Sequence, residues 1–146
     1  MTFCMQSVIL YTSYKNVYNL QGEVIMMKLG FIGAGNMAKA IMGGVLKNGI
    51  FKPEEVIASD LYVPGLEAAK ESLGINITTD NKEVAKNSEV LFLAVKPQFY
   101  ADVIKEISEF ITEKQIVVTI APGKTLEYLG ETFGHPVKIV RTMPNT

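Results

Sequence analysis

Small residues recur in the chain at a spacing that suits phosphate binding. Gly33, Gly35 and Ala38 form the pattern G-x-G-x-x-A directly after the apolar run Leu29 to Ile32. In a strand-to-helix turn the first glycine permits a tight bend, the second lets a pyrophosphate approach the backbone, and the alanine lets helix and strand pack closely. The N–H groups at the helix start then face the phosphates. The spacing predicts a dinucleotide-binding turn; the alternative is a glycine turn that only connects a strand to a helix.

An acidic residue lies where such a fold would bind the adenosine ribose. Asp60 closes the second expected strand, 25 residues after Gly35. A carboxylate at that point accepts the ribose hydroxyls and repels a 2′-phosphate. No arginine lies nearby, and Lys70 is a helical turn or more away. The residue types therefore favour NADH over NADPH, and the alternative is that Asp60 caps a helix or turn without contacting a ribose.

Proline and small residues follow three other expected strands. The segments are Ala94 to Pro97, Ala121 to Gly123 and Thr142 to Thr146. Pro97 disfavours helical geometry at Lys96, so the chain leaves the sheet extended, at the edge where open α/β sheets bind ligands. These strand ends leave room for a flat ring such as nicotinamide. Lys96 either contacts a phosphate or substrate or is an exposed loop lysine.

Short apolar runs alternate with helical patterns from Lys28 onward. Several runs are apolar at nearly every position, which is typical of strands buried on both faces of a parallel sheet. The alternation predicts the α/β class, with a doubly wound (Rossmann-type) parallel sheet of about six strands and helices on both faces. Strands are expected over Leu29–Ile32, Val56–Ser59, Ile75–Thr79, Val90–Val95, Ile116–Ala121 and Val137–Val140.

The helices expected between these strands have recognisable faces and caps. The first has Met37, Ile41 and Val45 on one face, and the fourth, expected to be the longest, has Phe99, Val103, Ile107 and Phe110. Asn81 and Thr125 are expected to cap the third and fifth helices. The expected helices are Asn36–Asn48, Pro64–Leu73, a short one through Lys86, the fourth along the stripe just named, and a last one through about Phe133.

Composition and charge exclude several other functional classes. The chain has 146 residues, with 14 Lys and Arg against 15 Asp and Glu, which provides no general attraction for nucleic acids or anionic membranes. Cys4 cannot form an internal disulfide, and His135 alone cannot assemble a zinc site with it. No apolar run approaches the ~20 residues that cross a bilayer. We therefore expect a cytoplasmic protein without a metal, whose partner is a small molecule.

The first 26 residues differ from the rest of the chain. They lack the basic start, the long apolar run and the cleavage site of a secretion signal. Met26 and Met27 directly precede the first expected strand. We expect residues 1–26 to be an extension with little fixed structure and residues 27–146 to be a dinucleotide-binding domain. The alternative is an added edge strand or an oligomer contact from Ser7 to Tyr14.

Four segments together resemble the N-terminal half of pyrroline-5-carboxylate reductase. They are Phe31–Ala38, Asp80–Glu83, Val90–Pro97 and Arg141–Thr146, and the resemblance extends from Met27 to Thr146. It implies an oxidoreductase that reduces 1-pyrroline-5-carboxylate with NADH or NADPH, the last step of proline biosynthesis. Members of this family continue into a helical domain that dimerises and supplies most of the substrate pocket. We therefore expect the 146-residue chain to bind a dinucleotide and to reduce the imine poorly or not at all.

The resemblance also implies which residues bind the cofactor. Ile32 to Met37 would hold the pyrophosphate, Asp60 the adenosine ribose, and Asn81 would line the adenosine side. The loops Ala94 to Pro97 and Ala121 to Gly123 would line the site of the nicotinamide ribose and ring. No catalytic residue is implied, and Pro122 stands where the family usually has alanine, which removes a backbone donor. The implied positions are Ile32, Gly33, Ala34, Gly35, Asn36, Met37, Asp60, Asn81, Ala94, Val95, Lys96, Pro97, Ala121, Pro122 and Gly123.

Two other functions stay open. A different enzyme on the same fold, such as a deazaflavin-dependent NADP reductase or a 2-hydroxyacid dehydrogenase of the 6-phosphogluconate type, would share the glycine turn but not the ending Met143–Thr146. A stand-alone dinucleotide-binding or subunit-pairing module would have no catalysis. We expect His135 to be a turn residue, and Arg141 to contact either a substrate carboxylate or an interface.

Overall fold

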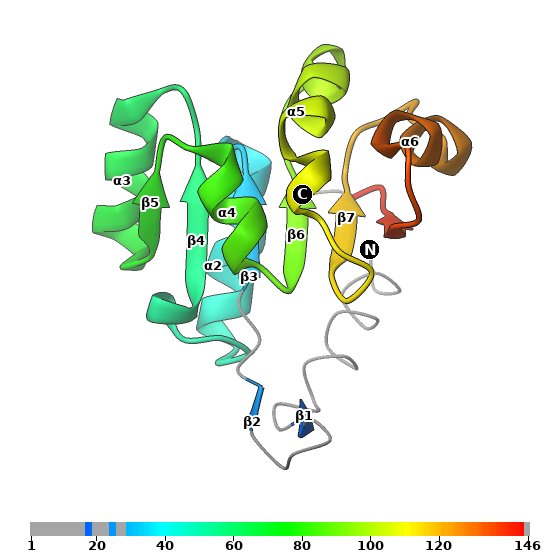
Figure 1. Cartoon of the computed structure of the whole chain (residues 1–146). Coiled ribbons are helices and arrows are strands. Elements are labelled where there is room, and N and C mark those ends of the chain that lie inside the picture. The colour runs from blue at the N-terminus through cyan, green and yellow to red at the C-terminus, as the bar shows by residue number, and fades with distance from the viewer. Residues whose placement is uncertain (1–16, 19–23, 26–28, 145–146) are drawn as a thin grey trace.

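A sheet of six parallel strands forms the centre of the computed structural model, which describes residues 17–18, 24–25 and 29–144. Its order is β5-β4-β3-β6-β7-β8. The chain builds outward from β3 to β5 and then adds β6, β7 and β8 on the other side of β3 (Figure 1). The doubly wound parallel sheet expected from the sequence is thus confirmed, and its winding reverses between β3 and β6. The strands are β3 (Leu29–Ile32), β4 (Val56–Ser59), β5 (Asn76–Thr78), β6 (Val90–Leu93), β7 (Ile116–Thr119) and β8 (Lys138–Arg141).

The two strands at the reversal are buried on both faces. Every residue of β3 and β6 is buried, and the rings of Phe31 and Phe92, paired in the parallel register, stack with their centroids 4.8 Å apart. Their continuous apolar runs are the reason, because each face of these strands meets helices. The strands expected through Val95 and Ala121 end earlier, at Leu93 and Thr119. Each of the two following loops therefore starts two residues earlier in the chain than expected.

Helices cover the two faces of the sheet in separate groups. Phe31 belongs to a core cluster with α2 and α3, and Ile32 to a second cluster with α4, α5 and α6. Consecutive residues of a strand point to opposite faces, so the two groups lie on opposite sides. Figure 1 shows α4 in front of the sheet and α2 behind it. The helices are α2 (Asn36–Lys47), α3 (Val63–Leu73), α4 (Asn81–Asn87), α5 (Tyr100–Ile107) and α6 (Leu126–Phe133), with short 3-10 turns η1 (Pro53–Glu55), η2 (Pro97–Phe99) and η3 (Ser108–Phe110).

Val45 lies on the buried face of α2 as expected, but the other two residues of the expected stripe do not. The buried residues of α2 are Ala38, Met42 and Val45, whereas Met37 and Ile41 are only partly buried. The expected stripe was therefore wrong by one position at its start. The small side chain of Ala38 allows close approach to the strand, so the helix turns this residue, rather than the larger Met37, toward the sheet.

The fourth expected helix is shorter than its apolar stripe. The helix α5 has 8 residues against 12 in α2, so it is not the longest. Phe99 lies in η2, with 51% of its surface exposed, and Phe110 lies in η3. Pro97 fixes a 3-10 turn before the helix, which displaces Phe99 from the stripe. Tyr100 and Ile104 join Val103 and Ile107 on the buried face.

One of the two expected helix caps is confirmed. The Thr125 hydroxyl accepts a hydrogen bond from the Tyr128 N–H at 3.1 Å at the start of α6. At the start of α4 the cap is Asp80 and not Asn81, because the Asp80 carboxylate accepts from the Lys82 N–H at 2.9 Å. Asp80 precedes the helix and has the extended backbone that a cap needs.

The N-terminal segment is described only at two short strands. β1 (Val17–Tyr18) and β2 (Val24–Ile25) pair antiparallel. The contact expected from Ser7 to Tyr14 lies outside the described residues, so both expectations for residues 1–26 stay predictions. In the part of the chain that the structure describes, no helix is long and apolar enough to cross a membrane. Nor do the described residues contain three or more His, Cys, Asp or Glu side chains grouped as metal ligands.

Candidate functional site

The glycine turn connects β3 to α2 at the point where the winding of the sheet reverses. Gly33 has φ +102°, and a Cβ built on it would lie 2.6 Å from the carbonyl oxygen of Ala94. Its N–H donates to the Ser59 carbonyl at 2.8 Å. Only glycine fits this position, because the turn needs a positive φ and passes directly against the end of β6.

The start of α2 is open to a ligand. Gly35 is the residue before the helix; it is exposed, and a Cβ built on it would meet nothing within 4 Å. No side chain caps the helix, and no acidic residue lies in its first turn, which contains Asn36 and Met37. The first-turn N–H groups and the helix dipole favour an anion here. The residues present therefore fit a pyrophosphate.

Asp60 holds the glycine turn from the end of β4. Its Oδ2 accepts from the Ala34 N–H at 2.8 Å, and its Oδ1 accepts from the Tyr62 N–H at 2.9 Å. The side chain therefore stabilises two turns, as the alternative interpretation proposed, and it also fixes a negative charge beside the glycine turn. Each carboxylate oxygen can accept a further bond, so contact with a ribose stays a prediction.

Asn81 joins three elements at the same edge of the sheet. Its Oδ1 accepts from the Ser59 hydroxyl at 2.7 Å, and its Nδ2 donates to the Glu106 carboxylate at 3.0 Å. This side chain ties the start of α4 to the end of β4 and to α5. Sequence reasoning missed Ser59 and Glu106, because neither lies in a motif. The predicted adenosine contact of Asn81 would have to use its second amide hydrogen or the second lone pair of its Oδ1.

The loop after β6 leaves the sheet as its proline requires. Lys96 has φ −63° and ψ 148°, the extended geometry expected before Pro97. The Ala94 N–H donates to the Ile32 carbonyl at 2.8 Å, which fastens the start of the loop to β3. Ala94, Val95 and Pro97 are partly buried, and Lys96 is exposed. The loop therefore starts beside the glycine turn, and its contact with a ligand stays a prediction.

The loop after β7 is more open. Ala121 is buried, whereas Pro122 and Gly123 are exposed, and Gly123 has φ +77° with nothing within 4 Å of a built Cβ. The Thr142 N–H donates to the Thr119 carbonyl at 2.9 Å, so the ending that follows β8 is attached to β7. The two loops thus follow the carboxyl ends of the neighbouring strands β6 and β7, and their role beside a flat ring stays a prediction.

A buried tyrosine that sequence reasoning missed lies beneath these loops. The Tyr100 side chain has no exposed surface, and its hydroxyl donates to the Leu93 carbonyl at 2.6 Å. The Thr119 hydroxyl lies 2.9 Å from the same oxygen. Burial raises the pKa of the Tyr100 phenol above its ordinary value. Tyr100, Val103, Ile104 and Ile107 are spaced so that they share one face of a helix, and this spacing could have identified Tyr100 as a buried residue.

The sequence also singles out His135 and Arg141. The His135 Nε2 is 2.7 Å from the Ser108 carbonyl, and the ring packs edge-on against Phe133. This contact is consistent with the expected role in a turn. Arg141 is the last residue of β8 and is exposed.

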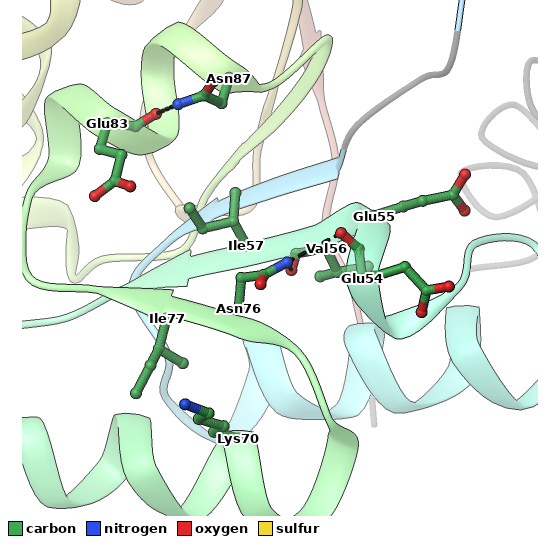
Figure 2. Close-up of a pocket in the computed structure, with 9 residues that line it drawn as sticks. All are labelled: Glu54, Glu55, Val56, Ile57, Lys70, Asn76, Ile77, Glu83 and Asn87. Atoms are coloured by element: carbon green, nitrogen blue, oxygen red, sulfur yellow. Dashed lines mark hydrogen bonds between the residues drawn. The ribbon is translucent and has the colours of Figure 1, made fainter.

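A cavity of about 390 Å³ lies elsewhere, beside the edge strand β5. Figure 2 shows Lys70 and Ile77 on one side of this strand and Ile57, Glu83 and Asn87 on the other. The Asn76 side chain, which also lines the cavity, donates to the Glu54 and Val56 carbonyls. None of the predicted site residues lines this cavity, so it is separate from the glycine turn.

The chain is similar in sequence to known NAD(P)-dependent oxidoreductases. Residues 28–123 match the family model described as NADP oxidoreductase coenzyme F420-dependent. The pyrroline-5-carboxylate reductase of Methanosarcina acetivorans is 42% identical over 118 residues, 81% of this chain and 44% of that protein. That of Escherichia coli is 40% identical over 122 residues, 82% of this chain and 44% of that protein. These relatives confirm the resemblance expected from the sequence, whereas the family description alone would fit other oxidoreductases.

Solved structures give the same result. A pyrroline-5-carboxylate reductase from Coxiella burnetii superposes with a TM-score of 0.78 and 36% identity over 82% of this chain and 44% of that chain. A Plasmodium falciparum pyrroline carboxylate reductase with NADP bound superposes with a TM-score of 0.71 and 28% identity, over 82% of this chain and 42% of that chain. The chain thus spans less than half the length of these relatives.

Proposed function

The chain belongs to the family described as NADP oxidoreductase coenzyme F420-dependent, and on that premise we propose that it is the dinucleotide-binding part of a pyrroline-5-carboxylate reductase. The reductase assignment rests on the relatives at 42% and 40% identity, and one observation carries the dinucleotide site: the uncapped start of α2 and the open space at Gly35 lie where the winding of the sheet reverses. Ligands of open α/β sheets bind at this point. The reaction would be reduction of the C=N bond of 1-pyrroline-5-carboxylate to proline.

The described residues suggest how a dinucleotide would lie. The N–H groups of Gly35, Asn36 and Met37 would hold its pyrophosphate, while Asp60 already holds Ala34 in place. The adenosine would extend toward Asp60 and Asn81, and the nicotinamide toward the two loops after β6 and β7. When bound, the dinucleotide supplies the hydride; the residues of this chain bind and orient it.

The substrate pocket is expected to depend on sequence outside the matched region. That region accounts for 44% of the length of the curated relatives. We therefore propose that the 146-residue chain binds the dinucleotide and turns over the imine slowly or not at all. Near-normal oxidation of NADH in the presence of 1-pyrroline-5-carboxylate by this chain would contradict the second part of the proposal.

We further propose that NADH is preferred over NADPH. The support is the Asp60 carboxylate, held at the end of β4 by the Ala34 and Tyr62 N–H groups. Its charge would repel a 2′-phosphate bound at the ribose. Lys70 is exposed on α3, and no arginine follows β4 in α3 to compensate. The Plasmodium falciparum relative was solved with NADP, so the preference is proposed for this chain alone.

A pair of glycine variants tests the binding site. Gly35→Ala places a methyl group where the pyrophosphate should approach, and nothing in the fold lies within 4 Å of it. Gly44→Ala adds the same group within α2, again with nothing within 4 Å. Titration calorimetry with NADH should give binding by the wild type and by Gly44→Ala, and at least about tenfold weaker binding by Gly35→Ala. Equal affinities of the two variants would contradict the proposed site.

A further inference from the structure

The Tyr100 hydroxyl lies in an otherwise apolar cluster between α5 and the sheet. The neighbouring buried residues of this cluster include Leu93, Ile104 and Leu129. A phenylalanine would pack in the same volume, so the ring alone does not explain the hydroxyl. A polar atom buried among apolar groups is unfavourable unless it is hydrogen-bonded, and here it has two partners.

Both partners of the Tyr100 hydroxyl lie directly before the two loops. The phenol has one hydrogen, which it donates to the Leu93 carbonyl at 2.6 Å, so the Thr119 hydroxyl must be the donor in the 2.9 Å contact. Leu93 is the last residue of β6 and precedes Ala94. Thr119 is the last residue of β7 and accepts, through the same hydroxyl, from the Ala121 N–H at 3.4 Å.

Thr119 extends the same network to the sixth strand. Its carbonyl accepts from the Thr142 N–H at 2.9 Å and from the Thr142 hydroxyl at 3.3 Å. Thr119 and Thr142 are both buried. One continuous set of hydrogen bonds therefore joins the carboxyl ends of β6, β7 and β8, and the Tyr100 hydroxyl is the link between β6 and β7 that is not part of the sheet ladder.

We propose that Tyr100 is a positioning residue for the nicotinamide end of the dinucleotide. It acts through the Leu93 carbonyl and the Thr119 hydroxyl, which fix the starts of the loops at 94–97 and 121–123 relative to each other. The inference rests on the proposed function, because it assigns these loops to the ring side of a bound dinucleotide. Tyr100 itself is fully buried, so we expect it to act without touching the dinucleotide.

The test compares two ligands that differ at the nicotinamide end. NADH would contact both the glycine turn and the loops, whereas ADP lacks the nicotinamide and its ribose. Tyr100→Phe keeps the ring and removes the link. Compared with the wild type, the Tyr100→Phe variant should have a dissociation constant for NADH that is about three- to tenfold higher, as expected for the loss of one hydrogen bond. Its dissociation constant for ADP should change by less than about twofold. Titration calorimetry measures both constants on the 146-residue chain.

A control variant removes an equally buried hydroxyl at the other end of the sheet. The Ser88 hydroxyl, two residues before β6 begins, donates to the Val84 carbonyl at 2.6 Å. Ser88→Ala should leave both dissociation constants unchanged. Thr119→Val should reproduce the selective loss for NADH, and the double variant with Tyr100→Phe should be weakened by less than the product of the two single effects.

The outcomes separate the role of Tyr100 from the proposed function. Unchanged NADH binding by Tyr100→Phe, equal losses for NADH and ADP, or losses that simply multiply in the double variant would each overturn the positioning role. A wild-type chain that binds neither NADH nor ADP would overturn the proposed function, and the role of Tyr100 with it. Binding of ADP without any gain for NADH would overturn the assignment of the loops, and with it the positioning role of Tyr100, but not the dinucleotide site at the glycine turn.

Discussion

The Asp60 carboxylate carries two roles that oppose each other in a substitution experiment. Both oxygens accept backbone N–H groups, one from the glycine turn and one from the turn that leads into α3. The same charge lies where a ribose 2′-position is expected. Removing it would relieve repulsion of a phosphate and would also loosen the turn that binds the pyrophosphate. A useful variant must therefore separate charge from hydrogen bonding.

Asp60→Asn removes the charge and keeps one of the two bonds, because its amide oxygen can still accept the Ala34 N–H while its NH2 group cannot accept the Tyr62 N–H. We expect the ratio of NADPH to NADH affinity to rise about tenfold in this variant, since the repulsion of the 2′-phosphate is lost. Asp60→Ser, which shortens the side chain, should raise the ratio similarly and weaken both ligands. Fluorescence titration of both cofactors measures the ratio. An unchanged ratio in both variants would remove Asp60 from the ribose site.

Gly33 should be the least replaceable glycine of the turn. Gly33→Ala brings a methyl group within 2.6 Å of the Ala94 carbonyl at φ +102°, so it suffers both a strained backbone and a collision. We expect the free energy of unfolding to fall by more than about 2 kcal/mol. Gly123 has φ +77° and open space around a built Cβ, so Gly123→Ala should lower the free energy of unfolding by about 1–2 kcal/mol through backbone strain alone. Urea unfolding that gives equal losses would contradict the close approach to β6.

The Tyr100 phenol also predicts a pH dependence of stability. Burial raises its pKa above the ordinary value of 10.0, so the folded state holds this proton more tightly than the unfolded chain does. Below pH 10 the group makes no pH-dependent contribution, and above it the wild type should lose stability as the unfolded phenol ionises. The stability difference between wild type and Tyr100→Phe should therefore shrink above pH 10. Urea unfolding from pH 8 to 11 measures it, and a constant difference would contradict the buried, neutral phenol.

At the scale of the elements, α2 matters because it carries the phosphate site on one end and the core on one face. Ala38, Met42 and Val45 lie against the sheet, and this rotation sets where the first-turn N–H groups point. The apolar periodicity placed Met37 on that face, because it counts apolar residues and does not measure their size, whereas the glycine-turn pattern placed Ala38 against the strand, as the structure has it. The contact of Ala38 with the sheet, which excludes larger side chains, decides the rotation.

Two leucine substitutions test the rotation of α2. Ala38 has no exposed surface, so Ala38→Leu should force the helix off the sheet and lower the free energy of unfolding by about 1–3 kcal/mol. Ala40 is exposed, and Ala40→Leu should change the free energy of unfolding by less than about 0.5 kcal/mol. Thermal or urea unfolding measures both. Equal effects would mean that the helix does not present Ala38 to the sheet.

At the scale of the whole molecule, the doubly wound parallel sheet and the glycine turn of the candidate site could be predicted from the sequence, whereas the order of the strands in the sheet was not. The apolar runs mark β3 and β6, and the glycine spacing marks the turn between β3 and α2, because both depend on neighbouring residues. The bonds of Asp60 to Ala34, of Asn81 to Glu106 and of Tyr100 to Thr119 could not, because each joins residues far apart in the chain. Such contacts exist only once the sheet has formed.

The most direct test of the binding site is a map of backbone amide shifts on addition of NADH. In a heteronuclear NMR titration of the wild-type chain, the amides of Gly35 and Asn36 and of the loops at 94–97 and 121–123 should shift, with Pro97 and Pro122 giving no signal. The amides around Asn76, beside the separate cavity, should stay unchanged. Shifts confined to Asn76 and its neighbours, or no shifts at millimolar NADH, would contradict a dinucleotide site at the glycine turn.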